Sequence, residues 1–142
     1  MKLAYSTNAY RRFDLLEAID RIAALRYNGI ELMADAPHAW PAGLTDERID
    51  AIRKRLDRRG LSISNINAFM TTAIGDFWHP SWIEPDPDRR RLRIDHTKRA
   101  LTLARELGAP SVTTEPGGPP AETQSREEAM ERFLEGLGEA LD

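Results

Sequence analysis

The side chain best suited to chemistry in this sequence is a carboxylate that directly follows a short apolar segment. Glu115 comes after the segment 111–114 and precedes Pro116 and two glycines. A carboxylate at the carboxyl end of a parallel strand projects into the region where ligands collect, and its oxygens suit Mg²⁺, Mn²⁺ or Zn²⁺. We predict that Glu115 is a metal ligand and a catalytic residue. The alternative is a solvated loop carboxylate or one that caps the next helix.

A second carboxylate lies inside an apolar segment. Glu31 stands between Ile30 and Leu32. Burial of an unpaired carboxylate is costly, so its side chain must face a barrel interior, solvent or an ion-pair partner. We predict that Glu31 is catalytic and forms the polar floor of a site, with a purely structural ion pair as the alternative.

Polar and aromatic side chains follow two of the apolar segments. His38 and Trp40 come after the segment 30–33, and Asn67 ends the segment 61–67. A neutral imidazole, a flat indole and an amide with both donor and acceptor are suited to bind a ligand that carries hydroxyl groups beside an apolar face. We predict that these three residues contact substrate. The alternative for His38 is a surface loop histidine.

The most aromatic stretch of the chain is residues 76–82, within a long connection of about 68–85. Connections of this length without secondary structure are uncommon unless they bind or cover a ligand. We predict that Trp78, His79 and Trp82 contact substrate. The alternative is that the aromatic rings plug one end of a barrel. His96 falls within a helical pattern, where packing or surface exposure is expected.

The elements that must position these residues are four β segments that alternate with four amphipathic patterns. The β segments are 3–5, 30–33, 61–67 and 111–114, and the helical patterns cover 15–26, 45–59, 87–107 and 125–141. Strands joined by crossover helices are parallel. We predict one α/β domain over residues 1–142, a (β/α)4 unit with strand order 1-2-3-4 and helices outside. A doubly wound sheet is the competing arrangement.

Two patterns specify which side chains face the core. Strict alternation places Leu61, Ile63 and Asn65 on one face of their strand and Ser62, Ser64 and Ile66 on the other. In the last helix, the predicted apolar face consists of Met130, Phe133, Leu134, Leu137 and Leu141.

Composition narrows the function classes. The 142 residues are 41% hydrophobic and 30% charged, with no cysteine and a net charge of −3. These values indicate a globular chain without thiolate metal sites, and they favour neither a nucleic-acid nor a membrane partner. The basic run Arg89–Arg91 is typical of a solvated helix face. The polar N-terminal segment does not resemble a signal peptide, so a cytoplasmic location is expected. Phosphate-binding glycine loops and the nucleophile-elbow motif are absent.

Four segments carry a resemblance to a known family. They are Gly29-Ile30-Glu31-Leu32, residues 64–68 (SNINA), residues 103–109 (LARELGA) and residues 113–118 (TTEPGG). In order and spacing they resemble the xylose-isomerase-like TIM barrels, which include sugar-phosphate isomerases, epimerases and enzymes of the endonuclease IV type. The resemblance implies an eight-unit barrel of roughly 250 residues, of which this chain is the N-terminal half. Glu31 is shared with the family, whereas Glu115 stands where a histidine is common.

The resemblance implies a sugar or sugar-phosphate isomerase or epimerase that uses a divalent metal, Mn²⁺, Mg²⁺ or Zn²⁺. In the family, most metal ligands come from the second half of the barrel. One alternative is an inactive half-barrel scaffold that self-associates into a homodimer through its open sheet edges. Another is an endonuclease-IV-like, metal-dependent phosphodiesterase, which needs several histidines, and this chain has three.

Overall fold

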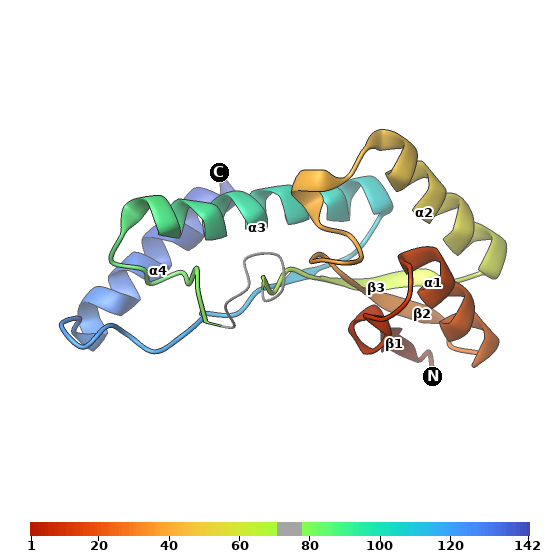
Figure 1. Cartoon of the computed structure of the whole chain (residues 1–142), viewed down its shortest axis with the longest axis horizontal. Helices are drawn as coiled ribbons and strands as arrows, with labels where there is room; N and C mark the ends of the chain where they lie inside the picture. Colours follow the sequence, from red (N-terminus) through yellow and green to blue (C-terminus); the bar gives the residue numbers. More distant parts are fainter. Residues whose placement is uncertain (71–77) are drawn as a thin grey trace.

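The computed structural model describes residues 1–70 and 78–142, and its four strands form one parallel sheet. The strands lie in the order β1-β2-β3-β4. The elements are β1 (Ala4–Ser6), η1 (Thr7–Tyr10), α1 (Leu15–Ala24), β2 (Gly29–Met33), η2 (Pro41–Gly43), α2 (Asp46–Arg59), β3 (Ser62–Asn67), α3 (Pro87–Leu107), β4 (Val112–Thr113) and α4 (Arg126–Leu141) (Figure 1). The predicted order and helix count are confirmed, and the doubly wound alternative is excluded because β1 lies at the edge of the sheet.

Helix ends follow local chemistry. Ser125 and Glu128 form a reciprocal capping box, in which each side chain accepts a hydrogen bond from the other residue's backbone N–H. Gly60 and Gly108 end α2 and α3 with φ values of +64° and +70°, a left-handed conformation that glycine adopts without steric cost. Gly60 and Gly108 come just before β3 and β4, so these two helix ends determine where the two strands begin.

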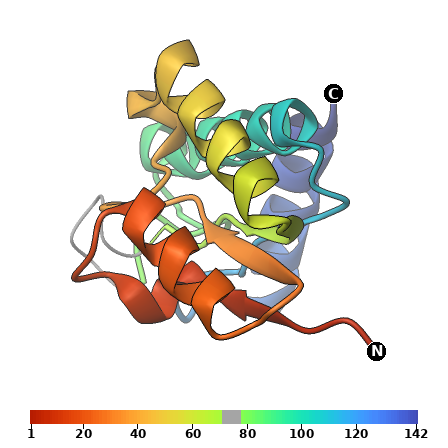
Figure 2. The same cartoon turned by 90° about the vertical axis from the view of Figure 1, so that its right-hand side faces the viewer.

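The main core lies between the sheet and the helices α1, α2 and α3. Its fully buried members include Ile19, Ile22, Ile30, Ile52 and Ile66. The three helices lie next to one another on the outside of the strands (Figure 2). One face of the sheet is therefore covered by helices, and the other face carries polar side chains of β2 and β3.

A β-bulge in β3 changes which side chains point to each face. Ile30 pairs with Ile63, but the next residue, Glu31, pairs with Asn65, so Ser64 is the extra residue. Ile63 and Ile66 are consequently both buried, while Asn65 is only half-buried. The strict alternation predicted for this strand was wrong beyond Ser64, because the bulge resets the register between β2 and β3.

A second core lies at the far end of the molecule, between α4 and the first half of α3 (Figure 1). Its centre is Trp82, which is fully buried and meets the Phe133 ring edge-on at 6.0 Å between centroids. A Cβ atom added at Gly136 would lie 3.2 Å from the Trp82 ring. The small residues of α4 therefore face α3.

The predicted apolar face of α4 was partly wrong. Met130, Leu134 and Leu141 are 50%, 58% and 69% exposed. The reason is that the bulky Trp82 ring packs against the side of α4 that carries the small residues Ala129, Gly136 and Ala140.

We predict that Trp82→Ala lowers the free energy of unfolding by about 3–5 kcal/mol, the range for truncating a buried aromatic side chain. Trp78→Ala is the matched control, because Trp78 is 49% exposed. Its expected loss is about 1 kcal/mol or less. Urea denaturation of the three proteins measures both values. Equal losses for the two variants would contradict the assignment of Trp82 to the second core.

Candidate functional site

A row of hydrogen-bonded polar side chains crosses β2, β3 and β4. The Glu31 carboxylate accepts hydrogen bonds from Asn65 Nδ2 at 3.0 Å and from Asn67 Nδ2 at 3.5 Å. Asn65 Nδ2 also lies 2.9 Å from Thr113 Oγ1, and Asn65 Oδ1 accepts from Ser111 Oγ at 2.9 Å. All five residues are half-buried or exposed. We call these residues, Glu31, Asn65, Asn67, Ser111 and Thr113, the polar row.

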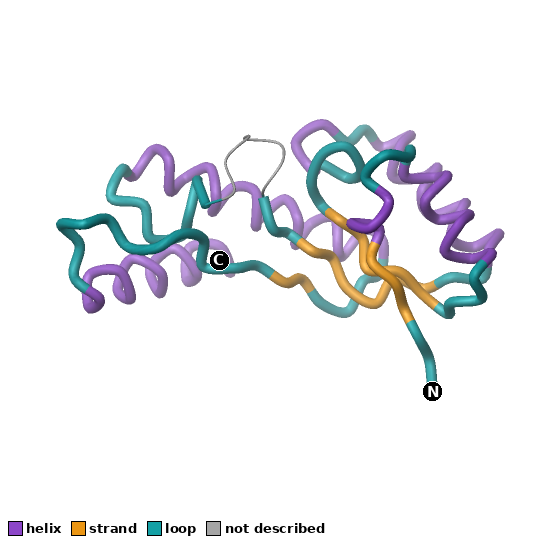
Figure 3. The backbone as a smooth tube through the Cα atoms, turned by 60° about the horizontal axis from the view of Figure 1, so that its bottom comes forward, coloured by secondary structure: helices purple, strands orange, loops and turns teal. Residues whose placement is uncertain are grey.

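The polar row lies on the sheet face opposite the main core. The backbone tube in Figure 3 shows the four strands side by side, with helices along their outer side. Glu31 meets the expectation of a partner because two amide groups donate to it. A carboxylate held among amides and hydroxyls retains further acceptor sites, so this surface can bind additional O–H groups.

Sequence reasoning found two members of the polar row and missed the residue that joins them. The structure brings Glu31 and Asn67 together, but Asn65 lies between β2 and β4 and bonds to both. Strict alternation had assigned Asn65 to the Ile63 face. Two consecutive polar residues, Ser64 and Asn65, in an otherwise alternating strand were the available signal of a bulge.

Glu115 lies at the rim of the sheet, immediately beyond β4, and is exposed. The backbone after it is fastened to the segment 78–82: Pro116 O accepts from Trp82 N at 3.1 Å, and Gly118 N donates to Trp78 O at 3.2 Å. Gly117 has φ +95°, and a Cβ atom there would lie 2.3 Å from Ser81 Cβ. Only glycine permits this close approach, which brings the backbone after Glu115 against the segment 78–82.

Arg93 is a buried cation beneath this rim that sequence reasoning did not single out. Its Nε donates to Pro80 O at 3.0 Å and its Nη1 to Ala68 O at 3.5 Å. Within the described residues its Nη2 has no hydrogen-bond partner. The available signal was helical spacing, because Arg93 precedes the buried residues Thr97 and Ala100 by four and seven positions.

The Arg93 guanidinium interacts electrostatically with carboxylates from several segments of the chain. Burial lowers the pKa of Arg93 to about 10, while the negative charges of Glu115, Asp35 and Glu84 oppose that shift. The guanidinium therefore remains protonated at neutral pH and is attracted to carboxylates from three different segments.

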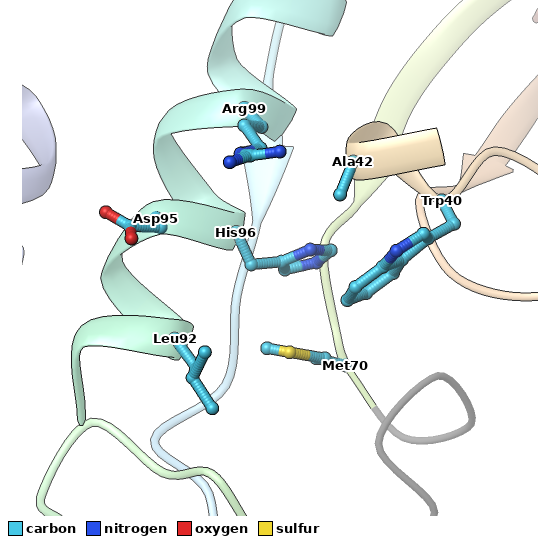
Figure 4. Close-up of a pocket in the computed structure, with 7 residues that line it drawn as sticks. All are labelled: Trp40, Ala42, Met70, Leu92, Asp95, His96 and Arg99. Carbon is cyan, nitrogen blue, oxygen red and sulfur yellow. The ribbon is translucent and has the colours of Figure 1, made fainter. Parts of the chain in front are cut away.

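His38 and Trp40 lie beside helices and outside the polar row. His38 is 5% exposed, and its Nε2 is 3.2 Å from the carbonyl oxygen of Phe13. It is not the surface histidine of the alternative interpretation, and burial lowers its pKa. Trp40 stacks on His96 with 4.8 Å between ring centroids. Figure 4 shows this pair in a pocket of about 140 Å³ between η2 and α3, whose other lining residues are Ala42, Met70, Leu92, Asp95 and Arg99.

The aromatic segment divides into a packed part and an exposed part. Trp82 is buried, and its Nε1 donates to Thr114 Oγ1 at 3.0 Å. Trp78 is half-exposed, and His79 Nδ1 lies 2.5 Å from Glu84 Oε1. Asp76 and Phe77, which begin the segment, lie outside the described residues. Trp82 thus packs in the second core, whereas Trp78 and His79 are accessible to solvent.

A metal site needs several ligands that converge on one point. Among residues 1–70 and 78–142, no three His, Asp or Glu side chains converge closely enough to hold a metal ion. Glu115 is therefore at most a single ligand at the rim, and the described part of the chain does not complete the coordination that the family resemblance implies.

Comparison with known proteins agrees with this geometry. The family model described as "Xylose isomerase-like TIM barrel" matches residues 19–142, and the chain belongs to that family. No curated protein sequence matches the chain. In the described residues, no helix combines the length and the apolar character needed to cross a bilayer.

Solved structures of low sequence identity share the fold. A D-psicose 3-epimerase from Clostridium cellulolyticum H10, solved with D-tagatose, superposes with a TM-score of 0.72 at 17% identity, covering 99% of this chain and 47% of that one. A 3-keto-D-glucoside 4-epimerase from E. coli gives 0.68 at 14% identity, covering 97% and 49%. A xylose isomerase-like barrel protein from Mycobacterium smegmatis, in complex with magnesium, gives 0.65 at 19%, covering 99% and 50%. The chain spans about half the length of these structures.

His96 yields a pH-dependent prediction. Burial lowers its pKa to about 4, with the nearby Arg93 charge acting in the same direction. The unfolded chain takes up this proton near pH 6.5, so the stabilising effect of a neutral His96 is complete above about pH 6.5 and disappears as the pH falls to about 4. We expect a loss of roughly 3 kcal/mol across that window.

His96→Phe is the matched variant, because it keeps a ring against Trp40 and removes the titrating group. It loses the Nε2 contact to Ala68 O, so it is less stable at neutral pH, but its stability should fall less steeply on acidification. Thermal melts of both proteins between pH 7 and pH 4 measure the difference. Parallel curves would contradict the prediction.

Proposed function

We propose that this chain forms the first four units of a barrel that isomerises or epimerises a sugar or sugar phosphate, with ketohexoses as the substrate class. The polar row is the observation that carries the proposal. Its carboxylate, amides and hydroxyls lie on the sheet face away from the helices and are connected by hydrogen bonds of 2.9–3.5 Å. Such a surface offers the alternating donors and acceptors that sugar hydroxyl groups require.

Within this proposal the residues have different roles. Glu31 is the catalytic carboxylate, which accepts a proton from the sugar while Asn65 and Asn67 hold it in place. Asn67 contacts substrate, and Trp78 supplies an apolar face at the rim. Glu115 is one oxygen ligand of a divalent metal, and the other ligands come from outside the described residues. Because that ligand set is incomplete here, no step is assigned to the metal.

The other functions considered have less support. A phosphodiesterase of the endonuclease type needs several accessible histidines, and His38 and His96 are 5% and 4% exposed. A scaffold without activity does not explain why five polar side chains are joined by hydrogen bonds on one face of the sheet. The net charge of −3 does not favour a nucleic-acid partner. The proposal also includes a cytoplasmic location.

Paired carboxylate variants test the proposal. Glu115→Gln keeps the side-chain volume and removes the charge, so we expect Mn²⁺ affinity to fall and stability to change little. Glu31→Gln should weaken ketohexose binding, because an amide replaces the acceptor shared by Asn65 and Asn67. Titration calorimetry with MnCl₂ and with D-tagatose measures the two effects.

Glu122→Gln is the control, because Glu122 is an exposed carboxylate in the loop that follows Glu115. It should leave both affinities unchanged. If Glu115→Gln keeps the Mn²⁺ affinity and instead loses about 1 kcal/mol of stability, Glu115 only tethers its loop.

We also propose that two copies of the chain associate through the outer edges of β1 and β4. Among the described residues these strands pair on one side only, and Leu134 and Met130 expose apolar surface on α4, the helix that follows β4 in the chain. Unpaired parallel strands and exposed apolar side chains favour association. Sedimentation equilibrium should give a dimer that Leu134→Lys weakens, whereas Lys54→Ala on α2 should have no effect. A monomer at every concentration would contradict the proposal.

A further inference from the structure

A histidine and a buried carboxylate form a close pair away from the polar row. His79 Nδ1 lies 2.5 Å from Glu84 Oε1, and the same oxygen accepts from Ser81 N at 3.0 Å. The side chain of Glu84 is 6% exposed, whereas that of His79 is 38% exposed. The carboxylate is therefore fixed inside the protein, and the imidazole reaches the surface.

The pairing specifies which ring nitrogen of His79 carries the proton. An ionised carboxylate only accepts hydrogen bonds, so Nδ1 must be the donor. In the neutral ring Nε2 is then unprotonated, and no hydrogen-bond donor among the described residues occupies its lone pair. This is the arrangement by which a carboxylate orients a catalytic imidazole in acid–base chemistry.

The imidazole borders a pocket of about 310 Å³. One side is formed by His79, Ser81 and Ile83, and the other by Pro119, Pro120 and Glu122 of the loop after β4. No member of the polar row lines this pocket. Two carboxylates, Glu84 and Glu122, make the pocket unfavourable for anions and favourable for neutral hydroxyl compounds.

We propose that His79 is a proton acceptor for a small hydroxyl-bearing ligand in this second pocket, and that Glu84 is its positioning residue. In the proton transfer, the ligand O–H bond breaks and its proton moves to Nε2. The resulting imidazolium is stabilised by the Glu84 carboxylate at Nδ1, and the ligand oxygen retains the electron pair. This second site goes beyond the proposed function, since neither residue belongs to the polar row.

The chain offers a direct probe, because it has three histidines and the other two are buried. Diethyl pyrocarbonate acylates unprotonated imidazole nitrogen. Under mildly alkaline conditions, we expect one histidine of the folded protein to react, and to react faster than N-acetylhistidine. His79→Gln should abolish this fast reaction.

Glu84→Gln tests the positioning role. Both hydrogen bonds go to one oxygen, Oε1, so a glutamine oxygen in its place still accepts from Ser81 N and from His79 Nδ1, and only the negative charge is lost. We expect most of the fast reaction to be lost. Glu84→Ala also removes the acceptor, so nitrogen-15 spectra of the histidine rings in that variant should show the proton move from Nδ1 toward Nε2. Glu135→Gln is the control, because Glu135 is an exposed carboxylate on α4 that does not line the pocket; it should keep both the reaction rate and the tautomer.

Two results would overturn the proposal. The first is a reaction at His79 no faster than that of N-acetylhistidine, which would describe an ordinary exposed imidazole. The second is a wild-type spectrum with the proton on Nε2, which needs no variant and does not depend on the folding of Glu84→Gln. A fast reaction that persists in both Glu84→Gln and Glu84→Ala would also count against the proposed role of Glu84.

Discussion

The structure depends on how a carboxylate is accommodated in the middle of an apolar strand. β2 pairs with β1 on one side and β3 on the other, and its Ile30 and Leu32 are completely buried. Glu31 lies between them and cannot be buried without partners. The bulge at Ser64 turns Asn65 toward Glu31 while Ile63 and Ile66 stay in the core. One irregular pairing thus allows a hydrophobic core and a polar surface on opposite faces of the same short sheet.

The second half of the chain extends this arrangement beyond the sheet. α3 continues past the ends of β3 and β4, and its first turns pack with α4 around Trp82 (Figure 1). Arg93 connects the two regions through the carbonyl oxygens of Ala68 and Pro80. Glu115 consequently interacts with the buried Arg93 cation, and the backbone that follows Glu115 is hydrogen-bonded to the segment 78–82.

Features that depend on residues near one another in sequence could be predicted. The capping box of α4 and the strand order follow from local signals and from crossover connections. Glu31 and Asn67 were each predicted as site residues, but their hydrogen bond was not, because it joins strands that are distant in sequence. Features set by contacts between distant segments could not be predicted. Asn65 depends on a bulge that exists only when β2 and β3 pair, and the exposed side of α4 depends on the Trp82 ring. The Glu84 partner of His79 is buried only after the loop following β4 packs against it.

The central claim is that the polar row binds sugar hydroxyl groups. The most direct measurement is a nitrogen-15 NMR titration of the protein with D-tagatose, following the side-chain NH₂ signals of Asn65 and Asn67. If the polar row binds the sugar, both signals shift and the shifts saturate, while the Nε1 signal of the buried Trp82 is unchanged. If the asparagine signals stay fixed at saturating sugar, or if only signals remote from the sheet respond, the polar row is not the binding surface and the claim is wrong.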